Sequence, residues 1–229
     1  MAVAFDKVTN LGTFTTTDPF TADHTPVGTP RGVSVFIFVA NAIDVVDGTV
    51  SYGGVAMARD QYAVINATED FGCWHYFLGA SVPTGTQSVS IDHTASAATK
   101  YAVCITYTAA ADLEIKASNK IESSPVDDPS IALDSGVSTA IRVGGLYTGT
   151  NSAANVAPAA AFTEAYELGV GAVNVQSVIY ETTPSSGSTS VAWTTQNEET
   201  AAVAAAIGEI AAAGYVPFDH YGMSGMFGV

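Results

Sequence analysis

Basic residues are scarce in this sequence. Seven Lys and Arg stand against 22 Asp and Glu, which gives a formal net charge of −15. Nucleic-acid binding depends on clustered cations that neutralise phosphates. The seven cations are instead scattered at Lys7, Arg31, Arg59, Lys100, Lys116, Lys120 and Arg142. We therefore exclude nucleic acid as a partner and interpret the acidic surface as one that keeps the chain soluble.

Long hydrophobic runs are also lacking, and no signal peptide is visible. The longest apolar stretch, residues 201–214, is Ala-rich and interrupted by Glu209, whereas a bilayer needs about 20 apolar residues. Residues 1–7 carry neither the basic nor the apolar region of a signal peptide. We expect synthesis in a cytoplasm and no membrane partner.

Cysteine is nearly absent. Cys73 and Cys104 cannot build a framework of disulfides, and neither lies at zinc-binding spacing from a histidine or another cysteine. In a reducing compartment two buried thiols are the favoured interpretation, and one disulfide between neighbouring strands is the alternative.

A convincing amphipathic helix is missing too, and apolar residues alternate with a period of two instead. This alternation predicts strands, and Gly53-Gly54 predicts a tight hairpin. The expected strands cover residues 32–39, 48–52, 55–57, 71–78, 87–91, 101–107, 139–147, 171–180 and 189–194. Residues 198–213 fit either a helix or a final strand.

Many short strands separated by turns predict an all-β fold, an antiparallel β-sandwich or jelly-roll-like domain over residues 1–212. Residues 213–229 then form an extended C-terminal tail, rich in glycine and aromatic residues. Left in water, such a tail would be an adhesive apolar patch. We expect it to pack against another subunit; the alternative is that it covers one end of its own sandwich. The expected interface residues are Tyr215, Phe218, Tyr221, Met223, Met226 and Phe227.

No pattern in the sequence points to catalysis. The four histidines, at 24, 75, 93 and 220, are far apart, and Ser224 lacks the context of a nucleophile elbow. Carboxylates gather at 44 and 47, at 69–70 and at 127–128. Asp127-Asp128 is the best Ca²⁺ candidate, although a solvated linker between sandwich halves explains it better. We predict no enzyme activity, no cofactor and no metal.

Exposed aromatic rings could also form a platform for sugars. Trp74, Tyr76 and Trp193 are the candidates, although aromatic residues in strands more often belong to the core. A glycan is therefore a possible partner.

The order of motifs resembles a β-sandwich module that recurs in virion proteins of tailed bacteriophages and in bacterial surface proteins. The resemblance covers residues 3–210, and no motif is specific alone. It depends on Ala4-Phe5-Asp6 with Asn10 and Thr15-Thr16, the strand 33–39, Val50-Ser51-Tyr52-Gly53-Gly54-Val55-Ala56-Met57, Trp74-His75-Tyr76-Phe77-Leu78, residues 83–91, residues 101–107, the strand 139–147 and Ser190-Val191-Ala192-Trp193-Thr194. The resemblance implies a final strand over about 200–207 and provides no catalytic residue.

The expected function is therefore a non-enzymatic structural protein of a virion, assembled in the host cytoplasm. Capsid decoration and a tail or fibre component are both compatible with it. Its partners would be other virion proteins and further copies of itself in a homo-oligomer such as a trimer. The alternative is a carbohydrate-binding adhesin module on a particle or cell surface.

Overall fold

The computed structural model describes residues 2–40, 46, 48–65, 71–93, 98–134, 139–149, 156–170, 174–181, 184, 188–195 and 198–211. Every regular element in these residues is a β-strand, and all the strand pairs are antiparallel. The predicted fold class, an all-β antiparallel sandwich, is therefore confirmed.

The first half of the chain forms two sheets. The N-inner sheet has the order β1-β9-β3-β7-β6 and the N-outer sheet the order β2-β8-β4-β5. The strands are β1 (Ala4–Phe14), β2 (Phe20–His24), β3 (Gly32–Val39), β4 (Val50–Tyr52), β5 (Val55–Ala56), β6 (Ala58–Ile65), β7 (Phe71–Leu78), β8 (Gln87–Ile91) and β9 (Lys100–Thr108).

The second half of the chain forms two further sheets. The C-inner sheet has the order β10-β17-β12-β15-β14 and the C-outer sheet the order β11-β16-β13. Their strands are β10 (Leu113–Val126), β11 (Ser130–Asp134), β12 (Ile141–Gly149), β13 (Ala157–Pro158), β14 (Phe162–Val170), β15 (Asn174–Glu181), β16 (Ser188–Thr194) and β17 (Glu198–Glu209).

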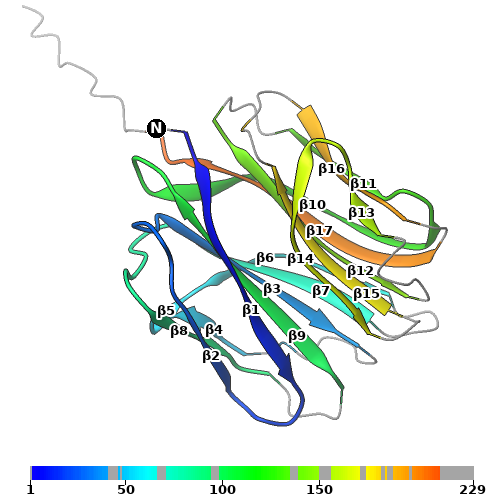
Figure 1. Cartoon of the computed structure of the whole chain (residues 1–229), viewed down its shortest axis with the longest axis horizontal. Helices are drawn as coiled ribbons and strands as arrows, with labels where there is room; N and C mark the ends of the chain where they lie inside the picture. The colour runs from blue at the N-terminus through cyan, green and yellow to red at the C-terminus, as the bar shows by residue number, and fades with distance from the viewer. Residues whose placement is uncertain are drawn as a thin grey trace, which may run out of the picture.

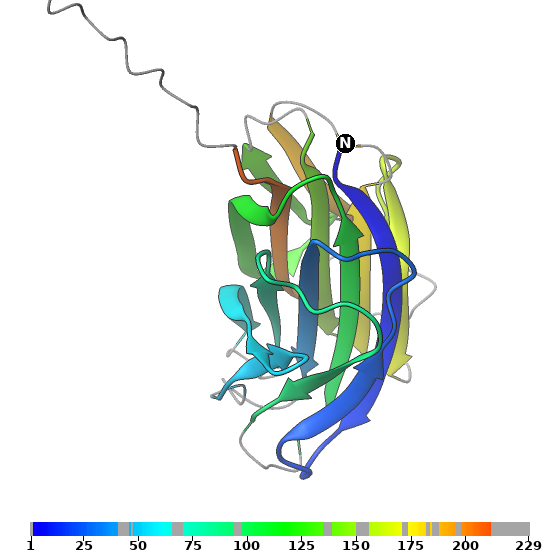
Figure 2. The same ribbon diagram turned by 90° about the vertical axis from the view of Figure 1, so that its left-hand side faces the viewer.

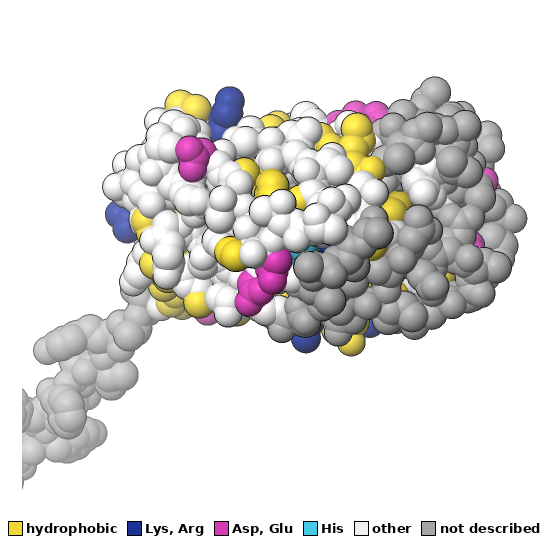
Figure 3. Space-filling model, turned by 90° about the horizontal axis from the view of Figure 1, so that it is seen from below, with side chains coloured by type: hydrophobic (Ala, Val, Ile, Leu, Met, Phe, Trp, Pro, Cys, Tyr) yellow, Lys and Arg dark blue, Asp and Glu magenta, His cyan; other side chains and the backbone are white. Residues whose placement is uncertain are grey.

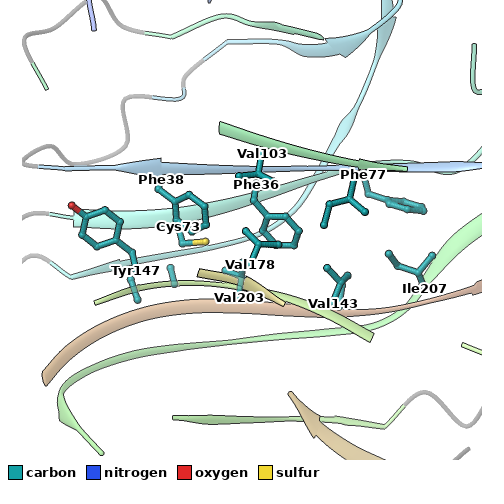
Figure 4. Packing of buried hydrophobic residues seen from close by; sticks show 14 of the residues in the cluster. Phe36, Phe38, Cys73, Phe77, Val103, Val143, Tyr147, Val178, Val203 and Ile207 are labelled. Carbon is teal, nitrogen blue, oxygen red and sulfur yellow. The ribbon is translucent and has the colours of Figure 1, made fainter. Parts of the chain in front are cut away.

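The four sheets form four layers, with the two inner sheets facing each other (Figures 1 and 2). Side chains of β3 alternate between two cores: Val33, Val35 and Ile37 face the N-outer sheet, whereas Phe36 and Phe38 face the C-inner sheet. This central core joins the halves, and Figure 4 shows residues from both inner sheets meeting in it. A third core lies between the C-inner and C-outer sheets around Trp193.

Strand order is the same in both halves. Each inner sheet begins with the first strand of its half, followed by the last and then the third. β-Bulges coincide as well: Asp60 in β6 and Ala165 in β14 are the extra residues opposite β7 and β15. A second matching pair of bulges occurs at Asp6 in β1 and Lys116 in β10. The chain is thus two jelly-roll-like sandwiches of one topology.

The bulges define which residues of the two halves are equivalent. Aligning the Asp60 and Ala165 bulges makes His75 equivalent to Val178. On the neighbouring strands their partners are Phe36 and Gly145. The equivalent residues Phe36 and Gly145 meet in the central core, because a Cβ built on Gly145 would lie 2.6 Å from Cδ1 of Phe36. A large residue of one half thus packs against a glycine of the other.

Several local predictions can be compared with this structure. The final segment is a strand, β17, and not a helix. Gly53 and Gly54 both have positive φ in the β4–β5 hairpin, as a two-residue turn requires. The proposed linker at 123–129 is wrong in its position, because residues 113–126 are strand β10 and the halves are joined at 109–112. The tail, 213–229, lies outside the described residues, so its boundary stays a prediction.

Candidate functional site

Three polar side chains form a hydrogen-bonded chain in the central core. Nδ1 of His75 lies 2.9 Å from Oδ2 of Asp60, and Nε2 lies 2.8 Å from Oγ of Ser34. The residues come from three neighbouring strands, β6, β7 and β3. This order of carboxylate, imidazole and hydroxyl is that of a serine-hydrolase triad, which sequence spacing did not reveal.

Burial gives the Asp60–His75–Ser34 chain a structural role. Ser34 is 0% and His75 1% exposed, and the imidazole ring stacks on Phe36 at a centroid distance of 4.6 Å. A nucleophile must reach a substrate, and the Ser34 hydroxyl is enclosed between the inner sheets. The bulge at Asp60 directs its carboxylate to the imidazole, since the extra residue changes the side-chain direction. The chain satisfies buried polar groups.

The other described histidines are separate from it and from each other. His24 lies 2.8 Å from the Thr9 hydroxyl through Nδ1 and 3.2 Å from the Thr106 hydroxyl through Nε2. Burial lowers the pKa of His24 to about 4, against the opposing field of Asp6. His93 bonds to the carbonyl of Thr17, and His220 lies outside the described residues. No group of three His, Cys, Asp or Glu that could hold a metal occurs in the described part of the chain.

Both cysteines are buried free thiols, which confirms the favoured interpretation. Cys73 faces the C-inner sheet and Cys104 faces the N-outer sheet, so the two lie on opposite faces of one sheet. Burial raises the pKa of each thiol.

Of the three acidic pairs found in the sequence, only Asp127-Asp128 lies in the described residues. Asp128 accepts a hydrogen bond from the backbone N–H of Thr195 at 2.9 Å, so it connects two segments of the second half. The pairs at 44 and 47 and at 69–70 lie outside the described residues. A pair that sequence reasoning missed is Glu164 and Glu167 on β14. Burial, and next the nearby Glu164 carboxylate, raise the pKa of Glu167.

The aromatic candidates for a sugar platform are mostly core. Trp74 is 0% and Trp193 1% exposed, and the indole N–H of Trp193 donates to the Ser177 hydroxyl. Tyr76 is also buried, but it lines a surface recess of about 320 Å³. This "Arg59 recess" is lined by Val46, Gly48, Thr49, Val50, Ala56, Met57, Arg59 and Tyr76.

Beside the Arg59 recess lies a small cationic and aromatic surface. The Arg59 guanidinium lies 5.0 Å and the Lys120 ammonium 4.8 Å from the ring centroid of Tyr62. Lys120 also pairs with Glu122 at 2.7 Å, and Glu122 accepts from the backbone N–H of Val64. These contacts link β10 to the edge strand β6, so the surface crosses the junction of the two halves.

Comparison with models of protein families, with curated proteins and with solved structures gives no match. The resemblance to a virion module is thus still a prediction. In the described part of the chain no helix has the length and apolar character to cross a membrane. The six expected interface residues of the tail, Tyr215, Phe218, Tyr221, Met223, Met226 and Phe227, lie outside the described residues.

Proposed function

We propose that the chain is a structural protein of a tailed-bacteriophage particle, either a capsid-decorating protein or a tail or fibre component. It acts through contacts with other virion proteins and with copies of itself. One observation carries the proposal: one chain contains two sandwiches of the same jelly-roll-like topology. Jelly rolls recur in viral capsid and lectin domains, where they serve as rigid building blocks.

Burial of the polar and aromatic groups supports this proposal. The Ser34 hydroxyl is enclosed, and the indole rings of Trp74 and Trp193 fill cores instead of forming a platform. On one face of the molecule the described residues show only small, separate hydrophobic patches (Figure 3). Rigid layers with filled cores suit a protein that contributes shape and contact area to an assembly.

Purified particles test the proposal. Mass spectrometry of density-purified virions, with antibody labelling in electron microscopy, is expected to find the chain at a fixed copy number per particle. Sedimentation of the purified chain is expected to show a closed homo-oligomer such as a trimer. A monomer that is absent from particles and binds a glycan array would overturn the proposal in favour of an adhesin module.

A further inference from the structure

We propose that the Arg59 recess receives residues 212–229 of a neighbouring copy of the chain. The inference rests on the proposed function, because it identifies the surface through which copies would join. Its elements are a recess with an apolar floor, a rim that carries Arg59 and Lys120, and a terminal segment with matching chemistry.

The accessible lining of the recess is mixed, slightly more polar than apolar, and its large apolar residues form a nearly buried floor. Val50 is 0%, Met57 7% and Tyr76 4% exposed, and all three line it. It lies between strands of the N-outer and N-inner sheets, where β5 is only two residues long. A volume of about 320 Å³ is in the range of small binding pockets. It can hold an aromatic side chain.

The charged side chains at the rim of the recess favour a ligand that carries an acidic residue. Two of the seven cations, Arg59 and Lys120, contact the ring of Tyr62, and one carboxylate, that of Glu122, pairs with Lys120. Residues 212–229 contain a single carboxylate side chain, Asp219, directly after Phe218. An aromatic residue next to an acidic one matches a recess with an apolar floor beside Arg59 and Lys120.

The segment is rich in large apolar side chains, whereas few such side chains are exposed in the described part of the chain. Among the described residues the exposed large hydrophobic side chains are Val27, Tyr62 and Ile210. Residues 215–229 contain two Phe, two Tyr and two Met, types enriched at the centres of interfaces. Fully extended, 18 residues span up to about 60 Å, which is sufficient to reach a neighbouring molecule.

A cross-link between native residues distinguishes a neighbour's segment from the chain's own. Carbodiimide joins a lysine ammonium to a carboxylate, and docking brings Asp219 close to Lys120. A full-length chain carrying Asp219→Asn is coexpressed with one carrying Lys120→Arg, so the only possible Lys120–Asp219 pair lies between copies. We expect this cross-link in the mixed oligomer. If it forms only in the unsubstituted chain, the segment binds its own recess, and the proposal fails.

Filling the recess tests the same contact by another route. Ala56 is exposed and lines the recess, whereas Ala58, the first residue of β6, is exposed but outside the set of lining residues. We expect Ala56→Trp to weaken self-association in sedimentation velocity by about tenfold or more and to abolish the cross-link. Ala58→Trp should change neither. Equal behaviour of the two variants, both folded by circular dichroism, would overturn the proposal.

The experiments on the docking site can fail or succeed independently of the experiments on the proposed virion function. Cross-linking and sedimentation use the purified chain, whereas copy number is measured in particles. A chain absent from particles that still shows the intermolecular cross-link contradicts the virion function and leaves the docking site standing. A chain present in particles whose Ala56→Trp variant self-associates normally contradicts the docking site alone.

Discussion

Nε2 of His75 lies 2.8 Å from the hydroxyl of Ser34, and the positions equivalent to these two residues in the second half are Val178 and Val143. The Asp60–His75–Ser34 chain therefore belongs to one half only. Because Ser34 and His75 are buried between the inner sheets, the imidazole depends on Ser34 and Asp60 for its hydrogen bonds.

Removing either end of this chain should destabilise the protein. Ser34→Ala and Asp60→Ala are each expected to lower the free energy of unfolding by about 1–3 kcal/mol, since each takes a hydrogen-bond partner from the buried imidazole. The double variant should deviate from additivity by about 0.5 kcal/mol or more, because both act through His75. Urea titration measures all three. Thr25→Val, which removes a surface hydrogen bond to Thr86, is the control and should change stability little. Strictly additive effects would contradict the coupling.

Gly145 should not tolerate a side chain. A Cβ there would lie 2.6 Å from Cδ1 of Phe36 and 3.0 Å from Sγ of Cys73. We expect Gly145→Ala to cost about 1–3 kcal/mol of unfolding free energy. At Gly208 the nearest atom to an added Cβ is Cε of Lys116, which can move, so Gly208→Ala is the matched control. An equal loss of unfolding free energy in both variants would show that Phe36 moves aside and that the central core accommodates the added methyl group.

Glu167 should make stability fall as the pH rises. Its pKa in the folded state is raised, chiefly by burial, so the folded state binds the proton more tightly than the unfolded state does. This contribution is complete below the ordinary glutamate pKa and is lost as the pH rises through the folded value. We expect Glu167→Gln to unfold at a higher urea concentration than wild type at pH 7 and to lose this advantage at pH 4. The exposed Glu114→Gln serves as the control. An advantage that does not depend on pH would contradict this assignment.

His24 should make stability fall as the pH falls, which is the opposite of the effect of Glu167. Burial lowers its pKa to about 4, so between about pH 6.5 and 4 the unfolded state binds more protons than the folded state. Stability from the neutral ring is present above this window and is lost as the pH falls through it. His24→Gln should flatten the dependence of the urea midpoint on pH between 7 and 4. An unchanged slope would mean that His24 accepts its proton without cost in the folded state.

The thiols should be inert until the chain unfolds. Cys73 and Cys104 are both 0% exposed and have raised pKa values, and the thiolate is the reactive form. A thiol-reactive dye should label neither in native buffer and both in denaturant. Rapid labelling of one cysteine in the native protein would show that its core opens locally.

In the two inner sheets the middle strands other than β17 were predictable, whereas the edge strands were not. β3, β7 and β9 were expected within one residue because they are covered on both sides and almost every residue is apolar. β6 and β10, which lie at sheet edges, carry charged residues and bulges that interrupt the period of two. The residues of β10 instead suggested a linker. Because β10 is such an edge strand, the boundary between the two halves was not located correctly from the sequence.

The candidate sites were less predictable, because they depend on pairing between strands. Asp60, Ser34 and His75 are 15 to 41 residues apart, and only the register of β3, β7 and β6 and the bulge bring them together. Arg59 and Lys120 come from different halves and share Tyr62. In contrast, burial of Trp74 and Trp193 followed from their apolar strand context.

The pairing of Phe36 with Gly145 restricts which halves can combine. If two first halves from different molecules met through their inner sheets, phenylalanine would confront phenylalanine and collide. Two second halves would place glycine against glycine and leave a void. Where many copies fold close together, a central core therefore forms between a first half and a second half, and not between two halves of the same kind. The short join at 109–112 favours the second half of the same molecule, which limits the exchange of halves between copies.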